Sequence, residues 1–331
     1  MQGKTIFLAF CLWLSLGSTS AFSQNYPTIY VGLVSVTPSN GAIMATVEGG
    51  YFKKHGLDVK PIIMAGSSTA IAAMLSGEVS VIAIAASGLI NAYLAGRDAV
   101  MVAGIVNFAP YELIVSKDIR SIEDLKGKKM GIARFGGSAD FLARWGLNHY
   151  GLKPDKDVIV LQVGGNAERM AAVSQGAIQA TLLEQAFAHL AKKRGLRSLL
   201  DYSTAGLDYQ HSGMGTTKSF IAKDPDLMKR FLEAMIEGIH RYKTDRAFGL
   251  KVLERHLRVQ DPETIQAVYD YYAPKTPLVP HVNMKGINFL LDTIAKRNPK
   301  AKNAKPEDIV DDSILQGIEA SGFVKQVAGG R

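Results

Sequence analysis

Cysteine and the familiar catalytic and metal-binding motifs are scarce in this sequence. It has one cysteine, Cys11, among 331 residues, which excludes a disulfide scaffold, a cysteine-rich zinc module and an iron–sulfur cluster. The seven histidines are scattered, without an H-E-x-x-H motif, and the chain has no P-loop and no G-x-S-x-G motif. Gly213-Met214-Gly215 begins like a dinucleotide fingerprint, but Lys218 replaces its third glycine. We therefore predict no catalytic residue, no metal and no cofactor.

The charge is moderate and mixed. The chain has 38 Lys and Arg against 30 Asp and Glu, a net charge of +8, and 47% hydrophobic residues. These values exclude bulk disorder and a coiled coil. The basic segment 296–305 contains no aromatic residue, so we interpret it as a solvated turn and predict no nucleic-acid partner. The length is typical of about two domains, and we expect a monomer.

The only long apolar run lies at the beginning of the chain. A short basic segment, Met1–Lys4, precedes the apolar run Ile6–Leu16, which is followed by small residues. This order is typical of a secretory signal peptide. A membrane anchor is the alternative, but it needs roughly 20 apolar residues. We predict a signal peptide over residues 1–23, cleaved after Ser23, and a periplasmic location.

Strand and helix patterns alternate along most of the chain. β-rich runs occur at 28–34, 57–64, 79–85, 99–105, 111–116, 129–134, 157–163 and 177–183, and helical patterns lie between many of them. This alternation predicts an α/β fold with mostly parallel sheets. Segments 72–84 and 171–183 resemble each other, which indicates two α/β halves with a boundary near residue 110.

The C-terminal third is predicted to be helical. Asp224-Pro225 and Asp261-Pro262 each have the form of an N-cap followed by proline at the first helical position. Helices are expected from these points to about residues 243 and 273. Two more are expected at 283–297 and 306–320.

Three loops share one composition: a strand, then glycine with serine, threonine or asparagine, then a helix. They are Gly66-Ser67-Ser68-Thr69, Gly136-Gly137-Ser138 and Gly164-Gly165-Asn166. Free N–H groups and the dipole at a helix N-terminus bind carboxylate, sulfonate or phosphate. The alternative is that each serine or asparagine only caps its helix. Because ligands gather at the carboxyl ends of strands in parallel sheets, the three loops together favour binding.

Several segments resemble a known family. Val47–Val59 (VEGGYFKKHGLDV) is similar to the "EkGyFkkeGLdV" segment of periplasmic substrate-binding proteins. The group concerned serves nitrate/sulfonate/taurine-type ABC importers and includes proteins similar to thiamine-precursor binders. Ser121–Ile132 resembles the family's "dLkGkkigv" segment, and Asp308–Asp311 with Ser321–Phe323 resembles its C-terminal helix pattern. Two positions depart from the pattern: Ser80 and Gln179 stand where many relatives have Asp.

The resemblance implies a two-lobe periplasmic binding fold, of the class II type, with the binding cleft between the lobes. Lobe one is expected to be residues 26–110 plus 217–331, and lobe two residues 111–216. The ligand-binding residues implied for lobe one are Thr37, Ser39, Asn40, Ser67, Ser68 and Ser87, and those implied for lobe two are Arg134, Phe135, Gly137, Ser138, Gly165, Asn166 and Glu184.

Two charged residues among these favour a zwitterionic ligand if both face the cleft. Arg134 could hold a carboxylate with two parallel hydrogen bonds, or it could pair with Asp140. Glu184 could meet a ligand ammonium group, or it could serve as a cap or an inter-lobe ion pair. Phe135, Phe108 and Tyr111 could flank an apolar part of the ligand or pack in the core.

The predicted function is a receptor that captures a small anionic or zwitterionic organic molecule and delivers it to the permease of an ABC importer. One alternative is an enzyme on the same fold with thiamine-precursor-type chemistry. We predict that it is not an enzyme, since the predicted loops contain neither cysteine nor histidine. A sensory co-receptor is a further alternative, because it would bind the same ligand.

Overall fold

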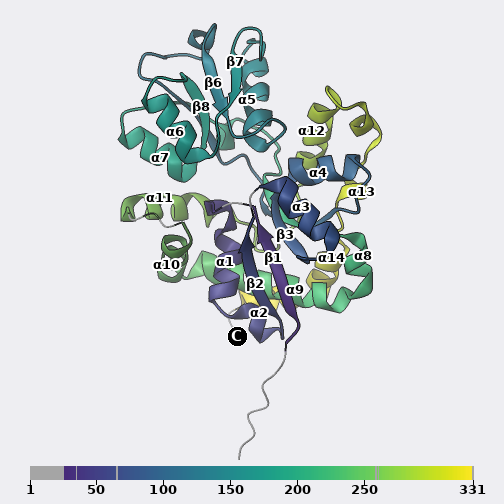
Figure 1. Ribbon diagram of the computed structural model, residues 1–331. Coiled ribbons are helices and arrows are strands. Elements are labelled where there is room, and N and C mark those ends of the chain that lie inside the picture. Colours follow the sequence, from purple (N-terminus) through teal and green to yellow (C-terminus); the bar gives the residue numbers. More distant parts are fainter. Residues whose placement is uncertain (1–25, 35, 65, 258, 260, 330–331) are drawn as a thin grey trace, which may run out of the picture.

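Two β-sheets, one in each half of the molecule, organise the fold (Figure 1). The computed structural model describes residues 26–34, 36–64, 66–257, 259 and 261–329. The predicted signal peptide, residues 1–23, lies outside the described residues. No helix in the described ranges combines the length and the apolar character needed to cross a membrane.

The first sheet lies in the lower half of Figure 1. Its strand order over the described residues is β2 (Asp58–Ile63), β1 (Thr28–Leu33), β3 (Val81–Ala85), β10 (Ser212–Thr216) and β4 (Val100–Val106). Strand β1 is parallel to β2 and β3, whereas β10 runs antiparallel to its neighbours β3 and β4. All strands except β10 therefore point the same way, in agreement with the predicted mostly parallel sheet.

The second sheet repeats this plan. Its strand order within the described chain is β7 (Ile159–Gln162), β6 (Lys129–Ile132), β8 (Ala180–Glu184), β5 (Tyr111–Val115) and β9 (Arg197–Asp201). Here β5 is the antiparallel strand, paired with β8 and β9. Each sheet thus contains one strand that runs against the others, and that strand begins at the edge where its parallel neighbours end.

Helices cover both sheets. The second sheet is covered by α5 (Ser138–His149), α6 (Asn166–Ser174) and α7 (Gln185–Lys193). The first half contains α1 (Gly41–Glu48), α2 (Tyr51–Lys54), α3 (Ser67–Ser76), α4 (Ala86–Leu94), α8 (Lys218–Lys223), α9 (Pro225–Thr244), α10 (Arg246–Leu257), α11 (Pro262–Tyr272), α12 (Met284–Ala295), α13 (Pro306–Ile309), α14 (Ser313–Ala320) and α15 (Phe323–Ala328). Short 3₁₀ turns lie at η1 (Pro38–Asn40), η2 (Glu123–Leu125), η3 (Tyr202–Thr204) and η4 (Pro299–Asn303).

Most expected elements are confirmed, and their local chemistry explains them. Every residue of β4 (VMVAGIV) is buried, as expected for a β-branched strand covered on both faces. Helix α9 begins as predicted, because the Asp224 carboxylate accepts a hydrogen bond from the Leu227 N–H at 2.9 Å and proline occupies the first helical position.

The predicted helix over 306–320 is wrong in one respect. It is divided into α13 and α14, and the residues between them follow the edge of the first sheet. Val310 forms a parallel bridge with Met101, and the Asp311 N–H donates to the Met101 carbonyl at 2.9 Å. Pairing with the exposed edge of β4 supplies the hydrogen bonds that a continuous helix would have made.

The sequence analysis did not predict β10, and the structure explains the glycines of this strand. A Cβ atom at Gly213 would overlap the carbonyl oxygen of Ala103, and one at Gly215 would lie 2.8 Å from Leu89 Cδ1. The two glycines therefore allow β10 to pack closely between strand β4 and helix α4. This packing, and not nucleotide binding, accounts for the Gly-Met-Gly pattern.

The chain passes between the halves at residues 107–110 and again between β9 and β10. Residues 212–216 lie in the first sheet, whereas the sequence analysis assigned them to lobe two. We therefore propose that the second lobe boundary lies before Ser212 and not at residue 217. The two crossing segments are tied to one loop: Asn107 Nδ2 donates to the His281 carbonyl at 2.8 Å, and the Asn283 N–H donates to Gln210 Oε1 at 2.7 Å.

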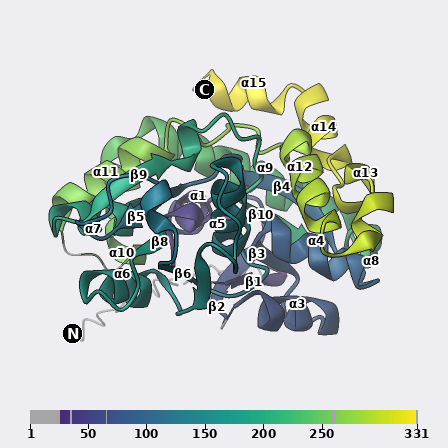
Figure 2. The ribbon, with the colours of Figure 1, turned by 90° about the horizontal axis from the view of Figure 1, so that it is seen from above.

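Further contacts join the halves on either side of the crossings. Figure 2 shows α7 beside α11, and α5 contacts α12 through aromatic rings. Lys193 Nζ, at the end of α7, lies 2.6 Å from Glu263 and 3.0 Å from Asp261. On the other side, the rings of Phe141 and Phe289 are 5.6 Å apart and meet edge to face. These contacts frame the space between the two sheets.

Candidate functional site

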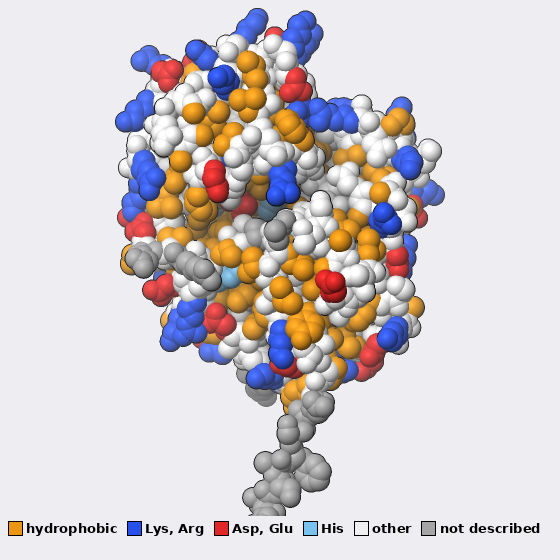
Figure 3. All heavy atoms as spheres, viewed as in Figure 1, with side chains coloured by type: hydrophobic (Ala, Val, Ile, Leu, Met, Phe, Trp, Pro, Cys, Tyr) orange, Lys and Arg blue, Asp and Glu red, His pale blue; other side chains and the backbone are white. Residues whose placement is uncertain are grey.

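A cavity of about 1140 Å³ opens between the two halves. In Figure 3 the surface is hollowed there, while Lys and Arg side chains lie mainly on the outer surfaces of both halves. All thirteen residues predicted for the cleft line this cavity: Thr37, Ser39, Asn40, Ser67, Ser68, Ser87, Arg134, Phe135, Gly137, Ser138, Gly165, Asn166 and Glu184. The loops that the sequence singled out in both halves therefore face one another across one space.

Helix N-termini surround the cavity. Helices α3, α5 and α6 begin there, each preceded by a glycine N-cap, namely Gly66, Gly137 and Gly165. Because glycine occupies each N-cap, Ser67, Ser138 and Asn166 stand at the first helical position and are not the N-cap residues of these helices. The first N–H groups of each helix face the cavity region and give it a partial positive charge.

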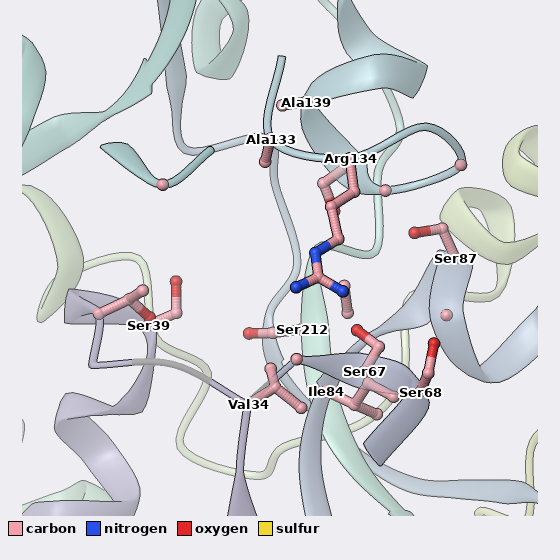
Figure 4. A pocket seen from close by; sticks show the side chains of 18 of the residues that line it. Val34, Ser39, Ser67, Ser68, Ile84, Ser87, Ala133, Arg134, Ala139 and Ser212 are labelled. Atoms are coloured by element: carbon pink, nitrogen blue, oxygen red, sulfur yellow. The ribbon is translucent and has the colours of Figure 1, made fainter. Parts of the chain in front are cut away.

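Arg134 follows β6 and points from the second half into the cavity (Figure 4). Its side chain approaches the first half, where its guanidinium lies near Gly66. The expected alternative partner, Asp140, accepts instead from Arg144 Nε at 2.5 Å and from the Gly136 N–H at 2.9 Å. Among the described residues, the guanidinium of Arg134 has no hydrogen-bond or ion-pair partner. It is therefore available to an anionic group in the cavity.

Glu184 ends β8 at the back of the cavity and is only 6% exposed. Its Oε1 accepts a hydrogen bond from the Tyr111 hydroxyl at 3.4 Å, and its Oε2 has no partner among the described residues. Burial raises the pKa of Glu184 to about 7, although Arg169, Asn166 and Tyr111 act in the opposite direction. A ligand could therefore supply the hydrogen-bond donor that Glu184 Oε2 lacks.

Arg169 is a cavity residue that the sequence analysis missed. It lies in α6, is 2% exposed, and donates to the carbonyl oxygens of Gly164 and Leu182 and to Asn166 Oδ1, at 2.5 to 3.2 Å. Its donors thus fix the loop before α6 and the end of β8. The Arg169 guanidinium forms no ion pair with Glu184 within the described residues, but its charge stabilises the ionised form of the Glu184 carboxyl group and so acts to lower its pKa.

His211 and Ser212 form another missed part of the wall. They precede and begin β10, and Tyr111 begins β5, so both antiparallel strands start at the cavity. Burial lowers the pKa of His211 to about 3, so the imidazole is neutral at pH 7. Neither His211 Nδ1 nor Ser212 Oγ has a partner within the described chain. The predicted loops contain no histidine, but His211 enters the cavity wall from outside them.

The aromatic candidates divide into two groups. Phe135 is 56% exposed and lines the cavity, as does Tyr111. Phe108 does not line it; its ring packs against Tyr271 at 5.6 Å, near the first crossing segment. Neither Ser80 nor Gln179, the two departures from the family pattern, belongs to the cavity wall. No cluster of three or more potential metal ligands occurs in the described ranges.

Comparison with known sequences identifies a family. A family model described as NMT1/THI5 like matches residues 37–245, more than half of the chain. A protein of Brucella abortus (strain 2308) named "Putative binding protein" is 28% identical over 163 residues, which cover 49% of this chain and 49% of that protein. The chain spans about half the length of the curated relatives it matches.

Solved structures share the fold at low sequence identity. A protein of Bordetella bronchiseptica RB50 has a TM-score of 0.76 at 18% identity, with 89% of this chain and 97% of that chain covered. The alkanesulfonate-binding protein SsuA of Xanthomonas axonopodis pv. citri, bound to MOPS, has 0.70 at 16%, covering 86% and 99%. The periplasmic nitrate-binding protein NrtA of Synechocystis PCC 6803 has 0.71 at 14%, covering 89% of each.

These likenesses confirm the two-lobe fold of periplasmic binding proteins. The segment that matches the family model also contains the site: it spans all thirteen predicted cavity residues as well as Arg169, His211 and Ser212. The chain belongs to the NMT1/THI5-like family.

Proposed function

We propose that this protein is an extracytoplasmic solute receptor that captures a small anionic or zwitterionic organic molecule and delivers it to the permease of an ABC importer. The observation that carries the proposal is the convergence of polar loops from both halves on one cavity that contains unpartnered polar atoms. The names of the sulfonate-binding and nitrate-binding neighbours support it. So does the name of the Brucella relative.

Capture follows from the arrangement of the halves. Arg134 extends from the second half toward Ser67 and Ser68 of the first, so a molecule held between them contacts both halves (Figure 4). Such bridging contacts favour a closed form in which the molecule is buried. The two crossing segments, which meet at Asn107 and Gln210, are the place where the halves can rotate. A permease that recognises the closed form would then receive the loaded receptor.

Native mass spectrometry of the protein purified without denaturant tests this proposal. We expect a stoichiometric bound small molecule, and rebinding of that molecule with a decrease in the radius of gyration by small-angle X-ray scattering. Calorimetry on protein stripped by unfolding and refolding gives the affinity. Tight binding without compaction, or an empty cleft that binds nothing, would contradict the receptor function.

The enzyme alternative has its own readout. His211 is the observation in its favour, because it is a neutral imidazole with an unpartnered nitrogen in the cavity wall. Among the described residues that line the cavity, however, none is a cysteine. We expect the bound molecule to be recovered with unchanged mass after prolonged incubation. A new product that accumulates in proportion to protein would instead favour chemistry in the cleft.

A further inference from the structure

The cleft is chemically asymmetric. From this asymmetry, and resting on the receptor function proposed above, we infer that the ligand is zwitterionic: its acidic group lies at Arg134, and its protonated nitrogen lies at Glu184. Glu184 is then the residue that distinguishes an amino-bearing ligand from a simple anion. Separate observations at Arg134 and at Glu184 support this assignment.

The acidic group is assigned to the Arg134 end by an unpaired cation and by buried hydroxyl groups. The guanidinium of Arg134 lies in the cavity without a partner in the described residues, close to the beginning of α3 at Gly66 and Ser67. Ser87, at the beginning of α4, is 2% exposed, lines the same cavity, and has a hydroxyl oxygen without a partner there. A carboxylate or sulfonate accepts from guanidinium, hydroxyl and backbone N–H groups alike.

The protonated nitrogen of the ligand is assigned to Glu184 because the carboxyl group of this residue has too few hydrogen-bond donors around it. Among the described residues, the Glu184 carboxyl group accepts one long hydrogen bond, from Tyr111 to Oε1, and Oε2 has no partner. The cation that acts on Glu184 is Arg169. Its N–H groups already donate to Gly164, Leu182 and Asn166. A buried carboxylate oxygen without a donor costs free energy, which an ammonium group of a ligand would recover.

The surrounding groups add no positive charge beyond that of Arg169 on α6. The other titratable side chains near Glu184 are Tyr111 on β5 and Tyr272 on α11, and the ring of His211, which precedes β10, packs against Tyr111. His211 is neutral, and burial raises the pKa of Tyr272 well above its usual value. The carboxyl group is therefore protonated in part at neutral pH, and it would ionise when a ligand ammonium binds. Binding should release a proton below pH 7.

The test is a competition among matched probes, measured by calorimetry. Taurine and β-alanine carry an amino group; ethanesulfonate and propionate are the corresponding anions without it. We expect at least one amino-bearing probe to bind wild-type protein at least 10-fold more tightly than its counterpart. Glu184→Gln should lower that affinity by about 10- to 100-fold. It should also abolish the proton release measured at pH 6 in two buffers of different ionisation enthalpy.

A matched variant separates loss of recognition from loss of folding. Glu112→Gln removes another buried carboxylate, on the neighbouring strand β5, which pairs with Lys192 at 2.8 Å and does not line the cavity. Its affinity should stay within twofold of wild type. Equal binding of amino-bearing and amino-free probes, or unchanged affinity in Glu184→Gln, overturns the zwitterion assignment and leaves the receptor function intact. Binding of none of the four probes overturns the assignment as well, while a different molecule found by native mass spectrometry would still support the receptor.

Discussion

Replacement of Glu184 by glutamine should make the empty protein more stable at alkaline pH. Glutamine keeps the size and the hydrogen-bonding capacity of the side chain but cannot carry a charge. In the wild type, burial raises the pKa of Glu184 from 4.5 to about 7. The folded state therefore binds a proton that the unfolded state has already lost over this range, and the wild type loses stability as the pH rises from 4.5 to 7.

The magnitude follows from the difference between the two pKa values. Each unit is worth 1.36 kcal/mol, so the whole shift corresponds to about 3 kcal/mol, and the part between pH 5 and pH 8 to about 2 to 3 kcal/mol. The glutamine variant lacks this dependence. For a chain of this size the difference corresponds to about 4 °C in Tm. We expect the Tm of Glu184→Gln minus that of wild type to rise by this amount between pH 5 and pH 8.

The assay is differential scanning calorimetry of ligand-free protein at several pH values. Taking the difference between variant and wild type removes the contributions of groups that titrate in both. Glu112→Gln is the matched control: its carboxylate is paired with Lys192, so its removal should give no gain in stability with rising pH. A pH-independent difference between Glu184→Gln and wild type would refute the argument, because it would mean that Glu184 is solvated or already paired in the folded protein.

Three further predictions concern single residues. Arg134→Gln should weaken binding of the native ligand by about 10- to 100-fold while changing Tm by less than 1 °C, because the exposed guanidinium makes no hydrogen bond or ion pair within the described residues. Calorimetry checks both quantities, with Lys300→Gln as the remote control. Unchanged affinity would contradict the role of Arg134. Gly213→Ala should destabilise the protein by about 3 kcal/mol or more, since the added methyl group overlaps the Ala103 carbonyl; a Tm equal to that of wild type would show that β10 can move away. His281→Asn should lose stability mainly at acidic pH. Burial lowers the pKa of His281, but its carboxylate partners Asp312 and Glu319 raise the pKa more. The stabilising charge is therefore present below pH 6.5 and is lost as the pH rises through the raised pKa. Its half-exposed position limits the effect to about 1 kcal/mol, and a difference from wild type that grows toward alkaline pH would have the wrong sign.

The glycine-rich loops could be predicted because their signals are local. A strand pattern, a glycine and a helix pattern follow one another within about ten residues, and the direction of a parallel strand determines where its last residue lies. This reasoning was sufficient to place Ser67, Ser138 and Asn166 at the cavity. It was also sufficient for Arg134 and Glu184, which end or follow such strands.

The residues that were missed belong to contacts between distant segments. His211 and Ser212 come before and at the start of a glycine-containing strand that has little strand character of its own, and Arg169 lies within a polar helix. In the fold, Ser212 pairs with Ala85 and Tyr111 pairs with Glu184, so the beginnings of antiparallel strands lie beside the ends of parallel ones. Nothing in the local sequence fixes that pairing.

The sequence by itself determined the alternation of strands and helices, the position of each glycine-rich loop and the chemical types of side chain that it presents, because these depend on periodicity and on backbone preferences over a few residues. Only the tertiary structure decided which charges remain unpaired: Asp140 is occupied by Arg144, and Arg169 is occupied by carbonyl groups, which leaves Arg134 and Glu184 free toward the cavity. The physical reason is that hydrogen-bond partners and burial are properties of segments brought together from far apart in the chain, and they set both the pKa of a carboxyl group and its availability to a ligand.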